Sequence, residues 1–440
     1  MQTGIKGIAE KARGDKTLQF TSIAHYITST RLRNNLKLIS GSSGVGVDKQ
    51  DVHAAKIEFS SWSKEMLDAV HRRGYKPPPT RRVYIPKPGK AKARRPISIP
   101  TVSDRVLQKS TADVLNAIYE QDFLDCSYGG RPNRSAHKAI ATLHLAISSR
   151  KVNWVFEADL KNFFGSLNHG WVERFLSHRV KDPRILTLIR RWLRAGVIDN
   201  GTYQKTTEGA AQGGPISVLI SNIYLHYVLD LWIEKVVKPK LKGEVYYVRY
   251  LDDFVLCFQY QSDALRFKEA LPNRLSKFSL ALEPDKTRLV KFGRWASRDS
   301  KLHKRTLQTI YFLGFTFYCS ENRHGRFKLG MKTERSRYRR SCANMKSLLM
   351  RIRHAPVRDQ AKLINLRLGG HFRYYGVAGN SELIRNYYYF TVKYWRKALS
   401  TRSQNGKVNW ESMNHILRTF PLCMSKIHVS YYDISHLASL

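Results

Sequence analysis

The chain has 440 residues, and its 76 Lys and Arg against 34 Asp and Glu give a formal net charge of +42. A soft prior of roughly 100 to 200 residues per domain allows two to four domains at this length. Because 42% of the residues are hydrophobic, the composition excludes a disordered basic tail and indicates a folded protein with a basic surface. We therefore expect a globular protein that binds nucleic acid.

The five cysteines are odd in number and scattered, without a C-x-x-C pair or the spacing of a zinc site. They indicate reduced thiols. The N-terminal segment lacks the apolar core of a secretory signal. The most apolar long stretch, residues 216–233, is interrupted by Ser221, Asn222, His226 and Asp230, which predicts a buried amphipathic helix instead of a membrane span. We expect a cytoplasmic protein with no membrane role.

The predicted elements follow one another without an internal repeat. Residues 1–40 show basic helical patterning, and the Gly- and Ser-rich residues 41–51 indicate a loop. Residues 76–100 predict a basic hairpin of two short strands with a turn at Pro88-Gly89. Then come a helix (about 104–120), a Gly-rich loop (127–135), a second helix, a buried strand in residues 154–164 and, from Met331, a helical period.

Acidic residues in an apolar context give the first chemical signal. Asp252 and Asp253 interrupt two strand-like runs in YYVRYLDDFVLCF, which predicts a hairpin tip. On the dipeptide alone a solvated turn is the simpler interpretation. Asp159, at the end of another apolar strand, changes the balance, because three carboxylates on two strand ends can hold two Mg²⁺ ions roughly 4 Å apart. That arrangement is typical of nucleotidyl transfer.

The three acids lie within a series of sequence segments that follow one another along the chain: GVDKQD, RRVYIPKPGKAKARRPISIPTVSDRVLQ, DCSYGGRPNRSAHKAI, FEADLKNFFGSLNH, AQGGPISVLISNIYLHYVLD, VRYLDDF, LEPDKTRLV, YFLGFTF and LRLGGHFRYYG. In this order the chain resembles the reverse transcriptases of the bacterial group II intron type. The resemblance implies an α+β, right-hand polymerase, and a bacterial protein associated with the nucleoid. Residues 1–125 would form an N-terminal extension and fingers, residues 126–325 a palm with an antiparallel sheet and remaining fingers segments, and residues 326–440 an α-helical thumb.

The resemblance also implies residue roles. The metal set is Asp159, Leu160, Asp252 and Asp253, and the catalytic set is Asp159, Asp252, Asp253 and Lys286, with Lys286 as proton donor to pyrophosphate. The dNTP set is Lys87, Arg95, Leu160, Phe164, Gln212 and Gly213, and the primer-end set is Leu251, Leu313 and Gly314. In this scheme Phe164 excludes a ribose 2′-hydroxyl, and Gly213 lets the backbone approach the bases.

Each role has a plainer alternative. The plainer alternative for Phe164 is a core residue, for Lys286 a surface lysine, and for Leu313-Gly314 an apolar strand with a glycine bulge. The sequence also departs from the family, which has a small residue at the position of Leu251 and Phe at that of Gly130. A branched side chain at position 251 is expected to touch the primer end or the incoming nucleotide.

The C-terminal third is strongly basic. Residues 332–397 hold 16 Lys or Arg against three acids, interleaved with aromatic residues. The aromatic spacing alone predicts a helical core. The charge excess predicts phosphate contacts with a template–primer duplex. After this region we expect no DNA-binding extension and no endonuclease domain.

The expected function is RNA-directed DNA synthesis from dNTPs. The expected partners are an RNA template, a DNA primer and their RNA–DNA or DNA duplex, and the cofactor is Mg²⁺, two ions, with Mn²⁺ as a substitute. Two alternatives stay open: a maturase that binds a structured intron RNA, and a domesticated enzyme of DNA repair or phage defence. Intact Asp159, Asp252 and Asp253 argue against a binding-only role.

Overall fold

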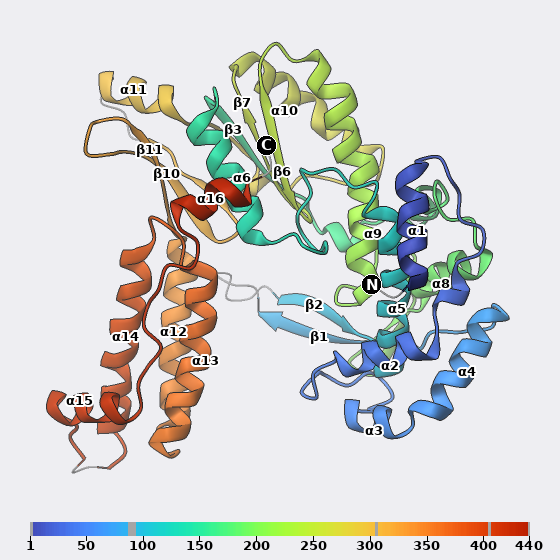
Figure 1. Cartoon of the computed structure of the whole chain (residues 1–440), viewed down its shortest axis with the longest axis horizontal. Helices are drawn as coiled ribbons and strands as arrows, with labels where there is room; N and C mark the ends of the chain where they lie inside the picture. The colour runs from blue at the N-terminus through green and yellow to red at the C-terminus, as the bar shows by residue number, and fades with distance from the viewer. Residues whose placement is uncertain (1–2, 87–93, 304–306, 404–405, 439–440) are drawn as a thin grey trace.

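The computed structural model describes residues 3–86, 94–303, 307–403 and 406–438. Figure 1 shows three regions. N-terminal helices lie at one side, a central sheet with its helices occupies the middle, and a C-terminal bundle of helices lies at the other side. The β1–β2 hairpin extends from the N-terminal region toward this bundle.

The N-terminal region is helical, as its patterning predicts. Two of its helices, α1 (Thr3–Gly14) and α2 (Ser29–Lys37), pack against the longer helix α5 (Val102–Tyr119). Side chains cap the starts of two helices, because Thr28 accepts a hydrogen bond from the Arg31 amide and Thr101 from the Asp104 amide. The remaining elements here are η1 (Ala24–Tyr26), α3 (Val52–Ile57) and α4 (Phe59–His71). Residues 41–51 form turns and loop, as predicted.

The predicted basic hairpin is present as β1 (Thr80–Pro86) and β2 (Arg94–Ile99), which pair antiparallel. Its expected Pro88-Gly89 turn lies outside the described residues. β1 also pairs in parallel with β4 (Val197–Asp199), and β4 pairs with β5 (Thr202–Gln204). The result is a four-stranded sheet of order β2-β1-β4-β5.

The central sheet has the order β6-β7-β3-β8 and is antiparallel throughout. Its strands are β3 (Trp154–Asp159), β6 (Val245–Tyr250), β7 (Asp253–Phe258) and β8 (Arg288–Lys291). Along β7, Phe254, Leu256 and Phe258 pack into one hydrophobic cluster, whereas Val255 and Cys257 pack into another. Both faces are therefore buried, which explains why these strands read as continuous apolar runs.

Helices cover both faces of the central sheet. α10 (Gln261–Ser276) contacts β3 and β7, and α6 (Ala136–Ser149) contacts β6. Between β3 and β6 in sequence lie η2 (Phe163–Gly165), α7 (His169–Leu176), α8 (Pro183–Arg194) and α9 (Pro215–Leu225). Two short helical turns lie later in the chain: η5 (Lys238–Lys240) precedes β6, and η6 (Pro284–Lys286) precedes β8.

A single helical segment runs from Pro215 to Lys240. It begins as α9 and widens into π-type turns at η3 (His226–Asp230) and η4 (Ile233–Val237). The segment is long and apolar enough to cross a membrane, but 78% of its most apolar window is buried inside the protein. It is a core helix, as the polar interruptions at residues such as Asn222 and Asp230 predict.

A third sheet connects the central sheet to the C-terminal bundle. It has the order β11-β10-β9, formed by β9 (Ile310–Phe312), β10 (Phe315–Glu321) and β11 (Phe327–Thr333), with α11 (Arg294–Leu302) before it. The expected change to helical structure at Met331 was wrong by four residues. Leu329, Met331 and Thr333 are all buried, a period of two that fits a strand and not a helix.

The bundle consists of α12 (Arg335–Ile352), α13 (Val357–Tyr375) and α14 (Ser381–Ser400), followed by α15 (Trp410–Thr419) and α16 (Tyr431–Leu437). α12 packs against both α13 and α14 (Figure 1). The prediction that its aromatic residues form a helical core holds in part. Tyr387 and Trp395 are buried in the bundle core, whereas Tyr389 is 61% exposed.

Candidate active site

The three predicted acidic residues come together at one end of the central sheet. Asp159 ends β3 and is the register partner of Asp253, the first residue of β7. Asp252 lies in the tip between β6 and β7, immediately before Asp253. The structure thus confirms the predicted hairpin and places the three carboxylates at the end of β3 and at the adjacent tip of the β6–β7 hairpin.

The electrostatics of these carboxylates reflect crowding. Burial and the Asp159 charge raise the pKa of Asp252, and the nearby cations Arg95 and Lys286 oppose this rise. Burial, Asp159 and Asp252 together raise the pKa of Asp253 well above its usual range. Like charges held this close favour either protonation or a shared cation.

Lys286 supplies part of the missing positive charge. Its ammonium group, from η6, forms an ion pair with the Asp159 carboxylate. Burial lowers the pKa of Lys286, but the hydrogen bond and charge of Asp159 outweigh that effect, so the pKa is raised. Lys286 is thus an exposed lysine, with 64% of its side chain accessible, that also pairs with Asp159, and its role as proton donor stays a prediction.

The donor set suits a hard divalent cation. Within the described ranges, no group of three or more His, Cys, Asp or Glu side chains is placed so that it could hold a metal ion. Asp159, Asp252 and Asp253 nevertheless offer carboxylate oxygens at one edge, with a negative charge that Lys286 offsets only in part. Leu160 is buried and pairs with Leu282, so its side chain contributes packing. Carboxylate oxygens are the ligands that Mg²⁺ prefers.

Phe164 and Gln212 line a common cavity of about 120 Å³ beside η2. The Phe164 ring is partly buried and packs edge-on against buried Phe163. The Phe164 carbonyl accepts a hydrogen bond from the Ala210 amide, which ties the loop before α9 to the loop after β3. Phe164 thus packs against the hydrophobic core and also lines the cavity, and its role in sugar selection stays a prediction.

The loop before α9 also attaches to the β1–β2 hairpin. The Ser98 amide of β2 donates a 2.7 Å hydrogen bond to the Gln212 carbonyl. Gly213 has a φ of +122°, and a Cβ atom there would lie 2.7 Å from the Ser98 carbonyl oxygen. The close approach seen at Gly213 is thus to β2, while approach to a base stays a prediction. Arg95 is exposed on β2, and Lys87 lies outside the described residues.

Leu313 and Gly314 form the turn between β9 and β10, both with positive φ. The Leu313 carbonyl accepts a 2.8 Å hydrogen bond from the Tyr374 hydroxyl of α13. A Cβ atom at Gly314 would lie 3.1 Å from the Tyr375 hydroxyl oxygen. The turn is therefore docked on the helical bundle, which places the predicted primer-end residues between the central sheet and the basic helices.

Leu251 forms the first residue of the hairpin tip and has a φ of +56°, an uncommon value for a branched side chain. Its side chain packs on the Gly-rich loop, because a Cβ atom at Gly129 would lie 2.8 Å from Leu251 Cγ. Glycine at this position thus leaves room for leucine at the tip. The expected contact of Leu251 with a primer end stays a prediction.

Sequence reasoning missed Arg249, two residues before the tip. It is fully buried and forms an ion pair with the equally buried Asp230 of η3, at 2.5 Å. Burial lowers the pKa of the Arg249 guanidinium, but the charge and hydrogen bond of Asp230 raise this pKa by more than burial lowers it. The net pKa is raised, so Arg249 stays protonated. The available signal was one Arg in an apolar strand and one Asp in an apolar helix.

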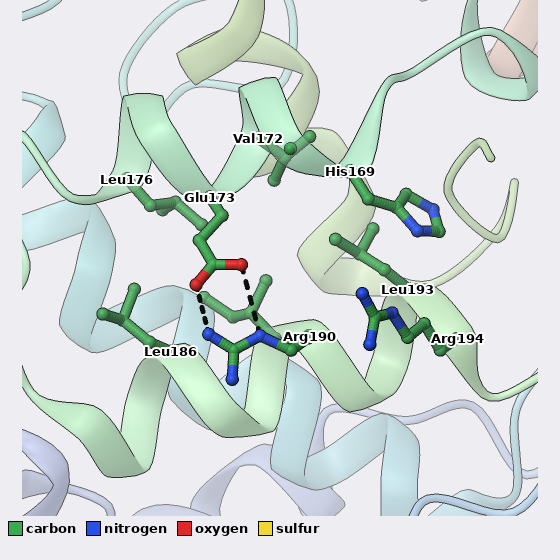
Figure 2. A pocket seen from close by; sticks show the side chains of 10 residues that line it. His169, Val172, Glu173, Leu176, Leu186, Arg190, Leu193 and Arg194 are labelled. Carbon is green, nitrogen blue, oxygen red and sulfur yellow. Dashed lines mark hydrogen bonds and ion pairs between the residues drawn. The ribbon is translucent and has the colours of Figure 1, made fainter. Parts of the chain in front are cut away.

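A separate cavity of about 60 Å³ lies between α7 and α8. Figure 2 shows apolar walls from Val172, Leu176, Leu186 and Leu193, with the Glu173–Arg190 ion pair across it. None of the predicted site residues lines this cavity. It is therefore distinct from the carboxylate end of the central sheet.

Comparison with known proteins agrees with this geometry. A family model described as reverse transcriptase (RNA-dependent DNA polymerase) matches residues 85–317, which contain the three acids, Phe164, Gln212 and Lys286. The chain belongs to the reverse transcriptase family. This reverse transcriptase is accordingly an enzyme, an RNA-directed DNA polymerase, and its mixed α/β structure with antiparallel sheets agrees with that family.

Several relatives are associated with introns. The reverse transcriptase is 37% identical over 172 residues to the group II intron-encoded protein LtrA of Lactococcus lactis, which covers 38% of this chain and 28% of LtrA. It is 28% identical to protein YkfC of Escherichia coli over 79% of this chain and 96% of YkfC. An uncharacterized 91 kDa protein in the cob intron of Schizosaccharomyces pombe is 32% identical, over 46% of this chain and 24% of that protein. The group II-type resemblance is thus confirmed.

Proposed function

We propose that this reverse transcriptase extends a DNA primer on an RNA template as a right-hand polymerase, with Asp159, Asp252 and Asp253 as its metal-binding catalytic residues. The N-terminal region with the β1–β2 hairpin acts as the fingers, the central sheet as the palm and α12–α14 as the thumb. The observation that carries the proposal is the register pairing of Asp159 with Asp253, next to Asp252 in the tip.

The three carboxylates would hold two Mg²⁺ ions, with Mn²⁺ as a substitute. When bound, these ions supply activation of the primer 3′-hydroxyl and offset the charge of the departing pyrophosphate. Lys286 Nζ carries a proton beside Asp159 and gives it to the pyrophosphate oxygen that leaves the dNTP. A protonated amine at this place also stabilises the negative charge that develops there.

Substrate binding follows from the neighbouring elements. Arg95 on β2 acts electrostatically on Asp252, which supports a place for this guanidinium beside the dNTP triphosphate. Phe164 and Gln212 line the adjacent cavity, where the Phe164 ring would exclude a ribose 2′-hydroxyl. The exposed cations of α12–α14 contact the phosphates of the template–primer duplex.

A maturase role, in which the protein only binds structured intron RNA, is less well supported. Such a role has no need of three crowded carboxylates, whose mutual repulsion costs stability without a cation. Intron RNA is still a plausible template, because LtrA is a group II intron-encoded protein.

The decisive experiment is primer extension by the full-length chain and its Asp252→Ala variant, with an RNA template, dNTPs and Mg²⁺. We expect extension to be lost and duplex affinity, measured by fluorescence anisotropy, to stay within twofold. Asp68→Ala, an exposed acid on α4, is the matched control and should extend normally. Near-normal extension by Asp252→Ala would refute the metal-site assignment.

A further inference from the structure

The buried Arg249 side chain uses its full hydrogen-bonding capacity on four residues from three separate segments. A guanidinium has five N–H donors in a rigid plane. Nε and Nη2 donate to the two Asp230 carboxylate oxygens at 2.8 and 2.5 Å, Nη2 also donates to Ser127 Oγ at 2.8 Å, and Nη1 donates to Asn222 Oδ1 at 3.0 Å and to the Leu251 carbonyl at 3.2 Å. One side chain therefore connects the long core helix, the Gly-rich loop and the catalytic hairpin.

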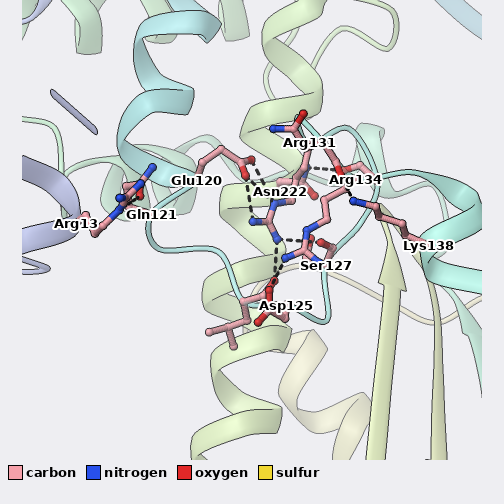
Figure 3. A network of polar contacts seen from close by, with 12 residues as sticks. Arg13, Glu120, Gln121, Asp125, Ser127, Arg131, Arg134, Lys138 and Asn222 are labelled. Carbon is pink, nitrogen blue, oxygen red and sulfur yellow. Dashed lines mark hydrogen bonds and ion pairs between the residues drawn. The ribbon is translucent and has the colours of Figure 1, made fainter. Parts of the chain in front are cut away.

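The surrounding partners are fixed in turn. Asn222 donates a 2.8 Å hydrogen bond to the Gly129 carbonyl. Arg131 donates to both Glu120 carboxylate oxygens and to the Ser127 carbonyl, which holds the loop that carries Ser127. Figure 3 shows Ser127, Arg131 and Asn222 gathered around this loop. The acceptors that meet Arg249 are thus held in place by a continuous polar network.

The bond to Leu251 has a direct consequence for Asp252. The Leu251 carbonyl belongs to the peptide group that joins Leu251 to Asp252, and a peptide group is planar. The hydrogen bond to the Leu251 carbonyl oxygen therefore restrains the plane of this peptide group, which includes the backbone nitrogen and Cα of Asp252. Leu251 also adopts a φ of +56°, a conformation that a leucine keeps only where its surroundings enforce it.

We propose that Arg249 is a positioning residue for the catalytic carboxylate Asp252, and that Asp230 holds its guanidinium in the orientation that reaches the Leu251 carbonyl. The proposal rests on the metal-binding role proposed for Asp252. It predicts that Arg249 affects how well the carboxylates bind the cation, beyond any effect on folding.

A purely structural buried ion pair is the alternative, and the chain offers a matched control for it. Arg179 is also buried and lies 3.2 Å from Asp122. Like Arg249 it donates to backbone carbonyls, at 3.0 Å to Ala12 and to Asp15. These contacts tie the N-terminal segment to the end of α7 and do not involve the hairpin tip.

The test compares Arg249→Lys with Arg179→Lys in the full-length chain. Both variants should lower the melting temperature. In single-turnover primer extension at saturating dNTP, Arg249→Lys should lower the rate at least tenfold and raise the Mg²⁺ concentration for half-maximal rate several-fold. Arg179→Lys should leave both quantities within twofold, and duplex affinity should be unchanged in both. Equal behaviour of the two variants at equal folded fraction would overturn the proposal.

A second pair covers the case in which Arg249→Lys does not fold. Asn222→Ala removes an Arg249 acceptor and the bond to Gly129, whereas Tyr247→Phe removes only a hydroxyl that donates to Asp230 at 2.9 Å. Asn222→Ala should slow extension at least threefold and Tyr247→Phe should not, and equal rates would refute positioning.

Asp252→Ala separates the two proposals. If it is inactive while the Arg249 variants behave like their controls, only the positioning role fails; if it is active, the metal assignment fails.

Discussion

The ammonium group of Lys286 forms an ion pair with the Asp159 carboxylate, although 127 residues separate them in the sequence. Asp159 ends β3, and Lys286 ends the short turn that precedes β8, the neighbour of β3 in the sheet. The pair therefore forms because two adjacent strands bring their ends together. Its charge balance raises the pKa of Lys286, so this amine is protonated at neutral pH.

Replacing Lys286 should slow nucleotide addition. Lys286→Ala removes the proton donor and its charge, and we expect at least a tenfold lower single-turnover rate. Lys286→Arg keeps the charge but not a readily transferred proton, so it should recover part of the rate. The wild-type rate should fall at alkaline pH as Lys286 loses its proton, and the Arg variant should lack that fall. Lys291→Ala, which removes an ion pair on β8 with Asp299, is the control; equal loss there would contradict the role.

Sugar selection should depend on Phe164. Phe164→Val enlarges the cavity that it shares with Gln212, so rNTP incorporation should rise at least tenfold relative to dNTP in a competition assay. The neighbouring Phe163 is buried and serves as the control. Phe163→Val should lower the melting temperature without changing selection. Unchanged discrimination in Phe164→Val would return this ring to a packing role.

Duplex binding should depend on Arg337 of α12. This exposed guanidinium lies beside the Leu313-Gly314 turn, because a Cβ atom at Gly314 would be 3.8 Å from Arg337 Cγ. Arg337→Gln should weaken template–primer affinity and reduce the slope of log K against log salt concentration by about 0.9, as the loss of one phosphate contact requires. The exposed Lys64 of α4 provides the control substitution, Lys64→Gln. An unchanged slope for Arg337→Gln would contradict this contact.

Acid should destabilise the protein in part through His371. Burial lowers its pKa to about 4, and its Nε2 has no hydrogen-bond partner. The unfolded chain binds this proton near pH 6.5, so stability is constant above that pH and falls toward pH 4, by roughly 1.4 kcal/mol per pH unit. His371→Phe should show a smaller loss of melting temperature between pH 6.5 and pH 5. A parallel pH dependence would show that other groups, such as the similarly buried His226, account for the loss.

Much of the β6–β7 hairpin was predictable from local sequence. The apolar runs on either side of Asp252 and Asp253 predicted two strands and a tip, and the structure has β6 and β7 there. The basic hairpin, the core helix and the loop at residues 41–51 followed from equally local patterns. Such features depend on the period of apolar residues and on turn chemistry, which a single sequence displays.

Nonlocal contacts could not be predicted in the same way. β4 is three residues long and pairs with β1, more than a hundred residues earlier, and nothing in either segment indicates the other. The partners of Arg249 come from Ser127, Asn222 and Asp230, which meet only after the sheet and core helix have packed. The end of β11 was missed because Met331 and Thr333 face a core that only the folded chain reveals.

The hydrogen bond from the Ser98 amide to the Gln212 carbonyl joins the β1–β2 hairpin to the loop before α9, so we expect the two to move together. Because residue 213 is glycine, the backbone of this loop lies in direct contact with the backbone of β2 at Ser98, and the two have little room to shift relative to each other. A swing of the hairpin toward the carboxylates would carry Arg95 and Gln212 together. In the proposed mechanism, the approach of Arg95 to the dNTP triphosphate and the approach of Gln212 to Phe164 would then occur in one movement.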